Sequence, residues 1–391
     1  MFLVEGAIIQ QENSKRRKTM KKKILLISLA ALLAVSLVAV GCGPKPTPTP
    51  PTPTPPRPPA PEVITWRFQP VFSPGHVDWA ILEKTIDDIW EASDHRLKIE
   101  LYPSGTFAGS MEAFQACAEG VFEVHMSWPV YLRGVDFGFQ AIGSGNMDME
   151  AIDKYVWLNE AGGHEIVDKA FEEINLKYVA AAVWGTEVMN ANIPVYNLED
   201  LRGKVFRTSD PRLCEKHGIA AITLPLEEVF TALATGAVDV VEFGHLNFNE
   251  GLGVTDVTRY SIYPDWWNVQ NLTAVVVNLD AWNALPPDLQ KIVEMCFRAW
   301  EFHHYTKTQY ASAVAQARMI EEGAMEFIRM DPEGFAQMRA DMREIEKSDI
   351  EKYGGLTREV YESYYDFKSV WFPYKDLARW WGWDVEPEEA M

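Results

Sequence analysis

The chain has 391 residues, with 36 Lys and Arg against 56 Asp and Glu, which gives a formal net charge of −20. This acidic balance argues against nucleic acid as a partner, because nucleic-acid binding needs basic patches. The four cysteines are widely spaced and form no CxxC metal or redox pair. Cys117, Cys214 and Cys296 are predicted to be buried thiols that form at most one disulfide.

Residues 1–41 read as a secretory signal, in which a block of lysines and arginines precedes the apolar run Ile24–Val40. The small residues before Cys42 resemble the lipobox of bacterial lipoproteins, although Ala39 stands where that motif usually has leucine. We therefore predict lipidation at Cys42. A retained transmembrane anchor is the alternative, since the run is nearly long enough to span a bilayer. Met20 begins a more ordinary signal than the first methionine does.

Residues 42–62 continue from Cys42 into the proline-rich stretch Pro44–Pro61. Such a stretch cannot build a packed core and is expected to be an extended polyproline tether of roughly 55 Å, at about 3.1 Å per residue. Either kind of anchor places the folded part outside the cell, held at the outer face of the cytoplasmic membrane.

From residue 63 the chain alternates between strand and helix patterns, which favours an α/β fold with mostly parallel sheets. The apolar residues of HVDWAILEKTIDDIWEAS recur at helical spacing, and those of HRLKIELYPSG alternate as in a strand. The expected strands lie in these stretches: ITWRFQPVF, RLKIEL, VFEVHM, KYVAAAVW, AITLP and AVDVVE.

One predicted helix is much longer than the others. It starts at Pro286-Pro287 and stops at Gly323, with neither proline nor glycine between those ends. About 36 helical residues would extend roughly 54 Å, so this helix is expected to brace two lobes. Its adjacent His303 and His304 point in different directions, so we interpret them as ordinary helix positions and not as a metal pair.

The C-terminal residues 341–391 are charged and rich in Tyr, Phe and Trp. We predict helices here as far as Pro373. Two interpretations of the aromatic residues remain open: they cover the protein's own core, or they form a subunit contact, where aromatic residues are enriched.

The stretch GKVFRTSDPRLCEKHG contains a predicted strand, Lys204–Thr208, which carries one arginine, Arg207, close to its end. Asp210 with Pro211 is typical of a helix start, with Gly218 as the stop. Most arginines at such places are solvated surface residues. The alternative is an anion site, because strand ends and helix starts meet at the ligand-binding edge of open sheets. An arginine there presents a planar fork that fits a carboxylate.

Taken together, four segments make the chain resemble the solute receptors of tripartite ATP-independent periplasmic (TRAP) transporters. They are RLKIELYPSGTFAGSMEAFQACAEG, EDLRGKVFRTSD, LPLEEVFTALATGAVDVVE and NLDAWNALPPDLQKIV. The resemblance runs from about Trp66 to Trp371. YSIYPDWW and the aromatic tail look most like the subgroup that binds 2-oxo acids, lactate and related monocarboxylates. The resemblance implies an extracytoplasmic receptor that captures a small organic acid and passes it to a two-part membrane permease.

The resemblance also implies a two-lobed periplasmic-binding-protein-like fold with hinge strands and one long helix spanning both lobes. Residues 63–184 with about 244–272 would form lobe I. Residues 185–243 with about 273–340 would form lobe II and the bracing helix. Related receptors pair through their C-terminal helices, so residues 341–391 are expected to offer a homodimer contact.

In the family, the arginine of a GxKxR strand grips the ligand's carboxylate, and Arg207 of GKVFR matches it. In the 2-oxo-acid subgroup a cation also bridges ligand and protein, and the matching positions here are Thr208, Glu242, Phe243 and Asn268. Only Glu242 is a carboxylate, and Phe243 offers a backbone oxygen. Because a hard cation needs several oxygens, any site here would have low charge and favour Na⁺ over Ca²⁺.

Further candidate contacts come from both lobes, and for each the alternative is packing in the core. The pocket is expected to include Trp266, Trp267 and His245. Residues expected to close over the ligand from the first lobe are Phe68, Trp128 and Tyr131.

Catalysis has no positive signal in the sequence, which contains no HExxH, no Walker loop, no GxSxG and no GxGxxG. We therefore predict that the protein is not an enzyme. The alternatives to a receptor are a lipid-anchored enzyme and a sensor module, each acting on a carboxylated ligand. A neighbouring gene for a two-part permease would distinguish the receptor from both.

Overall fold

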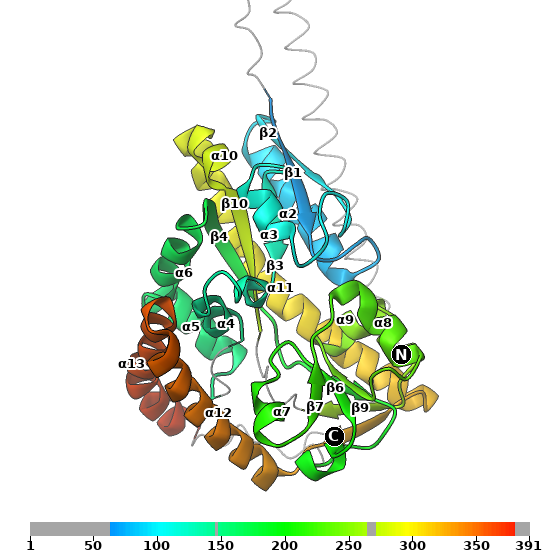
Figure 1. The fold of residues 1–391 in the computed structure, drawn as a ribbon. Coiled ribbons are helices and arrows are strands. Elements are labelled where there is room, and N and C mark those ends of the chain that lie inside the picture. Colours follow the sequence, from blue (N-terminus) through cyan, green and yellow to red (C-terminus); the bar gives the residue numbers. More distant parts are fainter. Residues whose placement is uncertain (1–62, 145–147, 264–270, 380–391) are drawn as a thin grey trace, which may run out of the picture. The chain divides into compact units, whose positions relative to one another are not determined.

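The computed structural model describes residues 63–144, 148–263 and 271–379. The predicted signal, lipidated Cys42 and proline-rich tether lie outside these residues. The described strands form two separate sheets with helices packed on them (Figure 1). Within the described part of the chain, no helix combines the length and apolar character needed to cross a membrane.

The first sheet has five strands in the order β2-β1-β3-β10-β4. We call this sheet and the helices packed on it the first lobe. Its strands are β1 (Ile64–Pro70), β2 (Leu97–Leu101), β3 (Val124–Ser127), β4 (Leu176–Val183) and β10 (Leu272–Asn278). Its helices are α2 (Val77–Ala92), α3 (Ala113–Ala118), η1 (Pro129–Leu132), α4 (Gly138–Ser144), α5 (Ala151–Glu160), α6 (Gly163–Glu172) and α10 (Leu279–Ala284).

The second sheet has six strands in the order β11-β9-β5-β8-β6-β7, and it defines the second lobe. Its strands are β5 (Met189–Ala191), β6 (Val205–Arg207), β7 (Ala220–Ile222), β8 (Val240–Glu242), β9 (Tyr260–Tyr263) and β11 (Glu326–Arg329). Its helices are η2 (Leu198–Leu201), α7 (Arg212–Lys216), α8 (Leu226–Ala234), α9 (Leu246–Gly251) and η3 (Val254–Asp256).

Both sheets are mixed, which differs from the expected mostly parallel sheets. Strand β10 runs antiparallel to β3 and β4, and β5 runs antiparallel to β8 and β9. The remaining described pairs are parallel. The reason is connectivity, because in chain order β5 and β10 each follow a strand of the other sheet.

The assignment of the later segments to lobes also differs from the expected division. Strand β9 lies in the stretch 244–272 expected in lobe I, but it pairs in the second sheet. Strand β10 lies almost wholly in the stretch 273–340 expected in lobe II, but it completes the first sheet between β3 and β4. A local pattern identifies a strand, whereas its partner is chosen by distant residues, so the sequence did not reveal this exchange.

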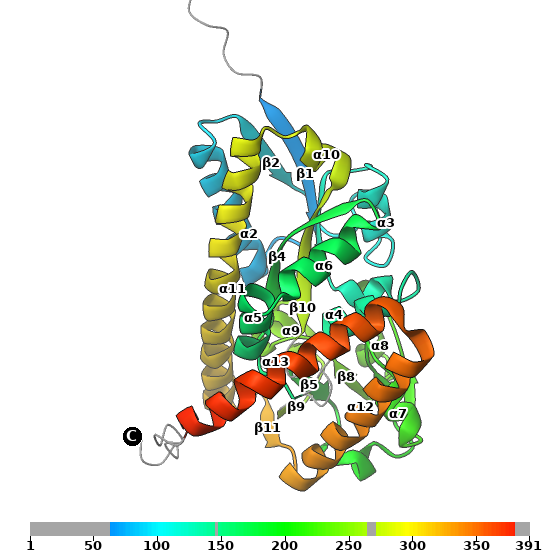
Figure 2. The same cartoon turned by 90° about the vertical axis from the view of Figure 1, so that its left-hand side faces the viewer.

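The predicted long helix is confirmed as α11 (Pro287–Glu322), 36 residues without an internal break. Proline begins it, and Gly323 ends it in the left-handed conformation with φ of 64°, which glycine adopts at little cost. Figure 2 shows α11 running lengthwise past both sheets. It packs on α2 and β4 of the first lobe and on α9 of the second, so it braces both.

Two helices end the described chain, α12 (Pro332–Tyr353) and α13 (Gly355–Arg379). Helix α12 packs on α7 of the second lobe, and α13 crosses α4 and α6 of the first (Figure 2). The predicted stop at Pro373 is wrong, because α13 continues through that residue. On either side of Pro373, Trp371 and Lys375 both bond to the Asp153 carboxylate, at 2.8 and 2.7 Å, and so hold the helix on α5.

The aromatic residues of α13 divide between the two interpretations left open by the sequence. Tyr361 and Tyr364 are completely buried in the core beneath the helix. On the outer face, by contrast, Val370, Tyr374 and Leu377 remain exposed. One face therefore completes the protein's own core, and the other is an apolar surface.

A cluster of buried charged and polar groups lies where α2, α9 and α11 meet. The Asp78 carboxylate accepts a hydrogen bond from His304 Nε2 at 2.7 Å, and His245 Nε2 lies 3.9 Å from the same oxygen. All three side chains are completely buried. Burial by itself would raise the pKa of Asp78, but the two facing histidine rings outweigh it and hold that pKa well below its usual range. Asp78 is therefore a buried anion that links both lobes to the bracing helix.

Candidate functional site

The site begins with Arg207, the last residue of β6. Its side chain is only 2% exposed, which excludes the solvated surface arginine that the sequence left open. Nη1 donates to the backbone oxygen of Glu242 at 2.7 Å, and Nη2 donates to that of Leu224 at 2.9 Å. The guanidinium also lies 4.6 Å from the ring centroid of Phe243. These contacts fix its plane before any ligand arrives.

The carboxylate of Glu242 ends the neighbouring strand β8, parallel to β6. It accepts a hydrogen bond from the backbone N–H of Ser209 at 3.0 Å, and Arg207 Nη1 lies 4.0 Å from the same oxygen. A buried carboxylate without such partners would repel an incoming acid. Here Arg207 and Ser209 offset much of its charge.

These side chains line a small cavity between the two lobes. Its lining is Trp128, Val130 and Tyr131 from the first lobe, Arg207, Ser209, Glu242 and Phe243 from the second, and Asn271 just before β10. Burial raises the pKa of Tyr131 to about 12, although the facing Arg207 opposes the rise, so its hydroxyl is neutral at physiological pH. The cavity thus has the oriented guanidinium of Arg207 on one side, and most of its remaining lining is apolar or aromatic.

Five of the residues predicted for the site are brought together in this lining: Arg207, Glu242, Phe243, Trp128 and Tyr131. Trp266, Trp267 and Asn268 lie outside the described residues. The other three are placed elsewhere. Thr208 turns its hydroxyl to the Asp210 backbone N–H at 3.1 Å, Phe68 packs against Phe297, and His245 accepts from Phe248 N at 3.1 Å to cap α9.

Sequence reasoning missed three lining residues: Val130, Ser209 and Asn271. Ser209 stands two positions after Arg207, so the end of β6 carries it to the same edge of the sheet. Asn271 is 3% exposed, and its side chain accepts from Leu272 N at 2.8 Å. The sequence signal that could have identified Asn271 is its polar side chain directly before the apolar strand β10, where the chain crosses from one lobe to the other.

The predicted helix start after Arg207 is displaced by one residue. Helix α7 begins at Arg212 with Pro211 as its cap, and Asp210 still accepts from Arg212 N at 3.2 Å. Because α7 is only five residues long and does not line the cavity, Arg207 and not the helix end provides the positive charge.

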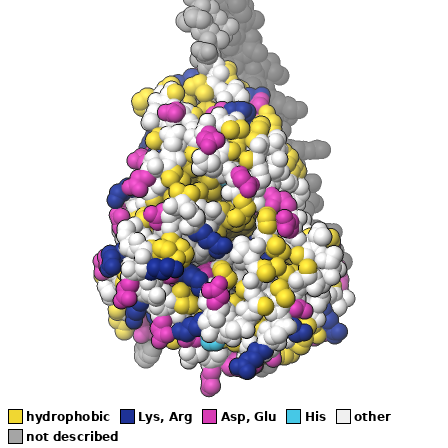
Figure 3. Space-filling model, viewed as in Figure 1, with side chains coloured by type: hydrophobic (Ala, Val, Ile, Leu, Met, Phe, Trp, Pro, Cys, Tyr) yellow, Lys and Arg dark blue, Asp and Glu magenta, His cyan; other side chains and the backbone are white. Residues whose placement is uncertain are grey.

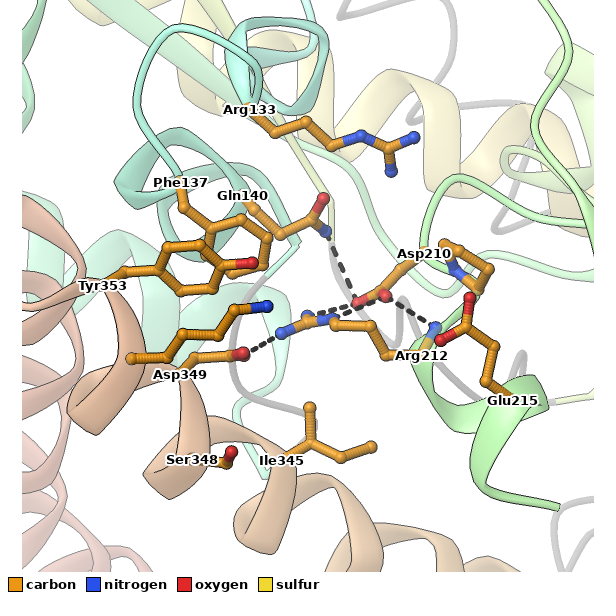
Figure 4. A pocket seen from close by; sticks show the side chains of 12 residues that line it. Arg133, Phe137, Gln140, Asp210, Arg212, Glu215, Ile345, Ser348, Asp349 and Tyr353 are labelled. Carbon is orange, nitrogen blue, oxygen red and sulfur yellow. Dashed lines mark hydrogen bonds and ion pairs between the residues drawn. The ribbon is translucent and has the colours of Figure 1, made fainter.

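A second, larger cavity is lined by residues of α4, α7 and α12 and of the loops beside them (Figure 4). Arg212 lies between Asp210 and Asp349 of α12, and Gln140 of α4 reaches Asp210 at 3.5 Å. Arg133, which follows η1, donates to the Ser209 backbone oxygen at 2.7 Å. Asp210, Arg212 and Asp349 are thus paired with one another and form a polar contact beside this cavity.

The surface seen in Figure 3 carries a group of apolar side chains in its middle, with Lys and Arg side chains directly below them. Acidic side chains are scattered around these groups. In a chain with a formal net charge of −20, this local basic group lowers the electrostatic barrier to an approaching acid.

A curated relative from Nostoc sp., described as a monocarboxylate 2-oxoacid-binding periplasmic protein, is 24% identical over 232 residues. The aligned part covers 59% of this chain and 64% of that protein, less than two thirds of the relative's length.

Solved structures of TRAP solute-binding proteins share the fold. One from Bordetella bronchiseptica, with copurified calcium and picolinate, has a TM-score of 0.74 at 18% identity, covering 81% of this chain and 96% of that one. One from Pseudoalteromonas atlantica, with bound sodium and pyruvate, has a TM-score of 0.73 at 20% identity, covering 81% and 98%. The sequence profile of the bacterial extracellular solute-binding proteins, family 7, matches residues 70–352. The chain belongs to this family.

Proposed function

We propose that the protein is an extracytoplasmic receptor that binds a small organic acid, such as a 2-oxo acid or lactate, and delivers it to a TRAP-type secondary transporter. The observation that carries the proposal is Arg207, a buried and pre-oriented guanidinium in a cavity between two lobes. We further propose that Cys42 carries the lipid that anchors the receptor to the membrane.

The geometry supports capture by closure of the lobes. Trp128 and Tyr131 approach the cavity from the first lobe, and Arg207 with Phe243 from the second. A ligand that contacts both sides stabilises the closed arrangement relative to the open one. The ligands named for the Nostoc relative and the Pseudoalteromonas neighbour, a 2-oxo acid and pyruvate, support the same class of solute.

Two of the structural neighbours hold calcium or sodium, so we asked whether the described residues fit such an ion. They do not fit a calcium cage, because the described lining supplies one carboxylate, and that group already faces Ser209 N and Arg207. Among the residues with described coordinates, no group of three or more His, Cys, Asp or Glu is arranged to hold a metal. Ca²⁺ takes six to eight oxygen ligands.

Calorimetry on the purified protein tests the proposal and the ion together. Pyruvate and lactate are titrated after exhaustive chelation in sodium-free buffer, and Na⁺ and Ca²⁺ are then added back separately. We expect binding of at least one of the two acids without either ion, since Arg207 is already in place. Failure of both acids to bind under all conditions overturns the proposed function. Affinity that one ion restores, and that Glu242→Gln abolishes, would establish a bridging cation.

The exposed face of α13 leads us to propose a homodimer. Val370, Tyr374 and Leu377 are 77%, 63% and 75% exposed on successive turns, and such apolar faces are typical of subunit contacts. Light scattering should give a dimer mass for the protein and a monomer mass for Val370→Glu. Phe302→Glu, at a similarly exposed position on α11, is the control and should stay dimeric. A wild-type protein that is monomeric at high concentration would contradict this proposal.

A further inference from the structure

Two hydrogen-bond donors in the cavity have no partner among the described residues: Nε1 of Trp128 and Nε of Arg207. Both side chains are almost fully buried, at 3% and 2% exposure, and both line the same cavity. A buried donor left unpaired costs about 1–3 kcal/mol, and native proteins rarely keep one without a reason. Two of them at one cavity indicate a ligand that accepts both hydrogen bonds.

The indole of Trp128 is held in place by aromatic packing. It follows strand β3 directly, and its ring centroid lies 5.4 Å from that of Trp184 and 6.1 Å from those of Phe243 and Phe248. Its N–H therefore has a direction fixed by residues of both lobes. Arg207 is fixed by the second lobe, through Glu242 and Leu224.

We propose that Trp128 determines specificity by donating its indole N–H to a second oxygen of the ligand, while Arg207 takes the carboxylate. This inference rests on the proposed function and narrows it to short 2-oxo and 2-hydroxy acids. An indole N–H only donates, so it accommodates a keto or a hydroxyl oxygen and leaves an acid without that oxygen unrecognised.

The cavity is narrow in this arrangement of the lobes. Its free volume is about 10 Å³, about the space that one water molecule needs. A short acid is therefore the ligand that requires the least opening of the lobes. With one acceptor at each end, such an acid connects the two lobes through a pair of hydrogen bonds that neither lobe satisfies by itself.

The test compares pyruvate and lactate with propionate, which has the same number of carbon atoms but lacks the second oxygen. Wild-type protein should bind pyruvate or lactate more tightly than propionate. Trp128→Phe keeps an aromatic ring and removes the N–H. We expect it to weaken binding of the preferred acid about 3- to 12-fold, the range that one neutral hydrogen bond supplies, and to leave propionate affinity unchanged.

Trp300→Phe is the matched control, because Trp300 is equally buried and its N–H also lacks a described partner, but it lies outside the cavity lining. It should preserve the ratio of the two affinities. If Trp128→Phe does not fold, replacing Trp128 with benzothienylalanine keeps the bicyclic shape without the N–H.

The outcomes separate this inference from the proposed function. If wild-type protein binds pyruvate or lactate and the Trp128 variant keeps the wild-type ratio to propionate, the inference is wrong and the proposed function stands. An equal loss for all three acids would likewise overturn it, because Trp128 would then contribute packing alone. Wild-type protein that binds none of them overturns both.

Discussion

Replacing Arg207 with lysine should weaken the binding of pyruvate about 10- to 100-fold, because hydrogen bonds to charged groups are worth about 1.5–3 kcal/mol. Lysine keeps the positive charge but has no planar fork. It cannot hold the backbone oxygens of Glu242 and Leu224 and still present a donor to the ligand, as Arg207 does. Titration calorimetry with pyruvate measures the change directly.

The control for this substitution is Arg202→Lys, four residues before β6 begins to pair with β8. Arg202 is 70% exposed at its side chain and contacts Glu199 on the surface, so its replacement should leave the affinity unchanged. Thermal melting of both variants separates a loss of fold from a loss of binding. Unchanged pyruvate affinity in Arg207→Lys would show that the buried guanidinium is a structural tie between strands and not the ligand anchor.

Replacing Asp78 with alanine should lower the free energy of unfolding by about 1.5–3 kcal/mol, the usual contribution of a hydrogen bond to a charged group. His304 would lose its 2.7 Å hydrogen bond and remain completely buried. Urea unfolding followed by circular dichroism gives the value. Asp88→Ala on the same helix is the control, because Asp88 pairs with Lys84 on the surface and such pairs contribute about 0.2–1 kcal/mol.

The Asp78 carboxyl itself should not titrate near neutrality. Because the folded state lowers its pKa, the stabilisation is fully present above the ordinary carboxyl pKa and is lost only as the pH falls through the lowered value. The stability advantage of wild type over Asp78→Ala should therefore shrink as the pH falls below about 4, the ordinary pKa of an aspartate. A difference of less than about 1 kcal/mol at pH 7 would contradict the assignment of Asp78 as a buried anion.

Local sequence patterns predicted the position of the anchor, the long helix α11 and seven of the eleven described strands, but not β5, β9, β10 or β11. Proline and glycine marked the ends of α11, and the strand before Arg207 placed that residue at a sheet edge. The direction of neighbouring side chains was not accessible in this way. Thr208 adjoins Arg207 in the chain, yet its hydroxyl is engaged with the Asp210 backbone.

Interactions between distant residues also lay beyond sequence reasoning. His304 was interpreted as an ordinary helix position, whereas the structure pairs it with Asp78, 226 residues away. The same limit applies to β9 and β10, which were not among the predicted strands and whose partners are set by the chain crossings between the lobes. Trp128, the proposed donor to the second oxygen of the ligand, was predicted from the sequence as a ligand contact. That its indole N–H has no described partner could be learned only from the folded cavity.

The position of β10 determines when each part of the protein can fold during synthesis. This strand separates β3 from β4, so the first sheet cannot close until residue 278 has left the ribosome, although four of its five strands have emerged long before. Until then the nascent chain exposes two unpaired strand edges, which invite wrong pairing. The second sheet waits still longer for β11. Neither lobe can therefore be produced alone by cutting the gene at one point, and the two are expected to reach the native state as one cooperative unit.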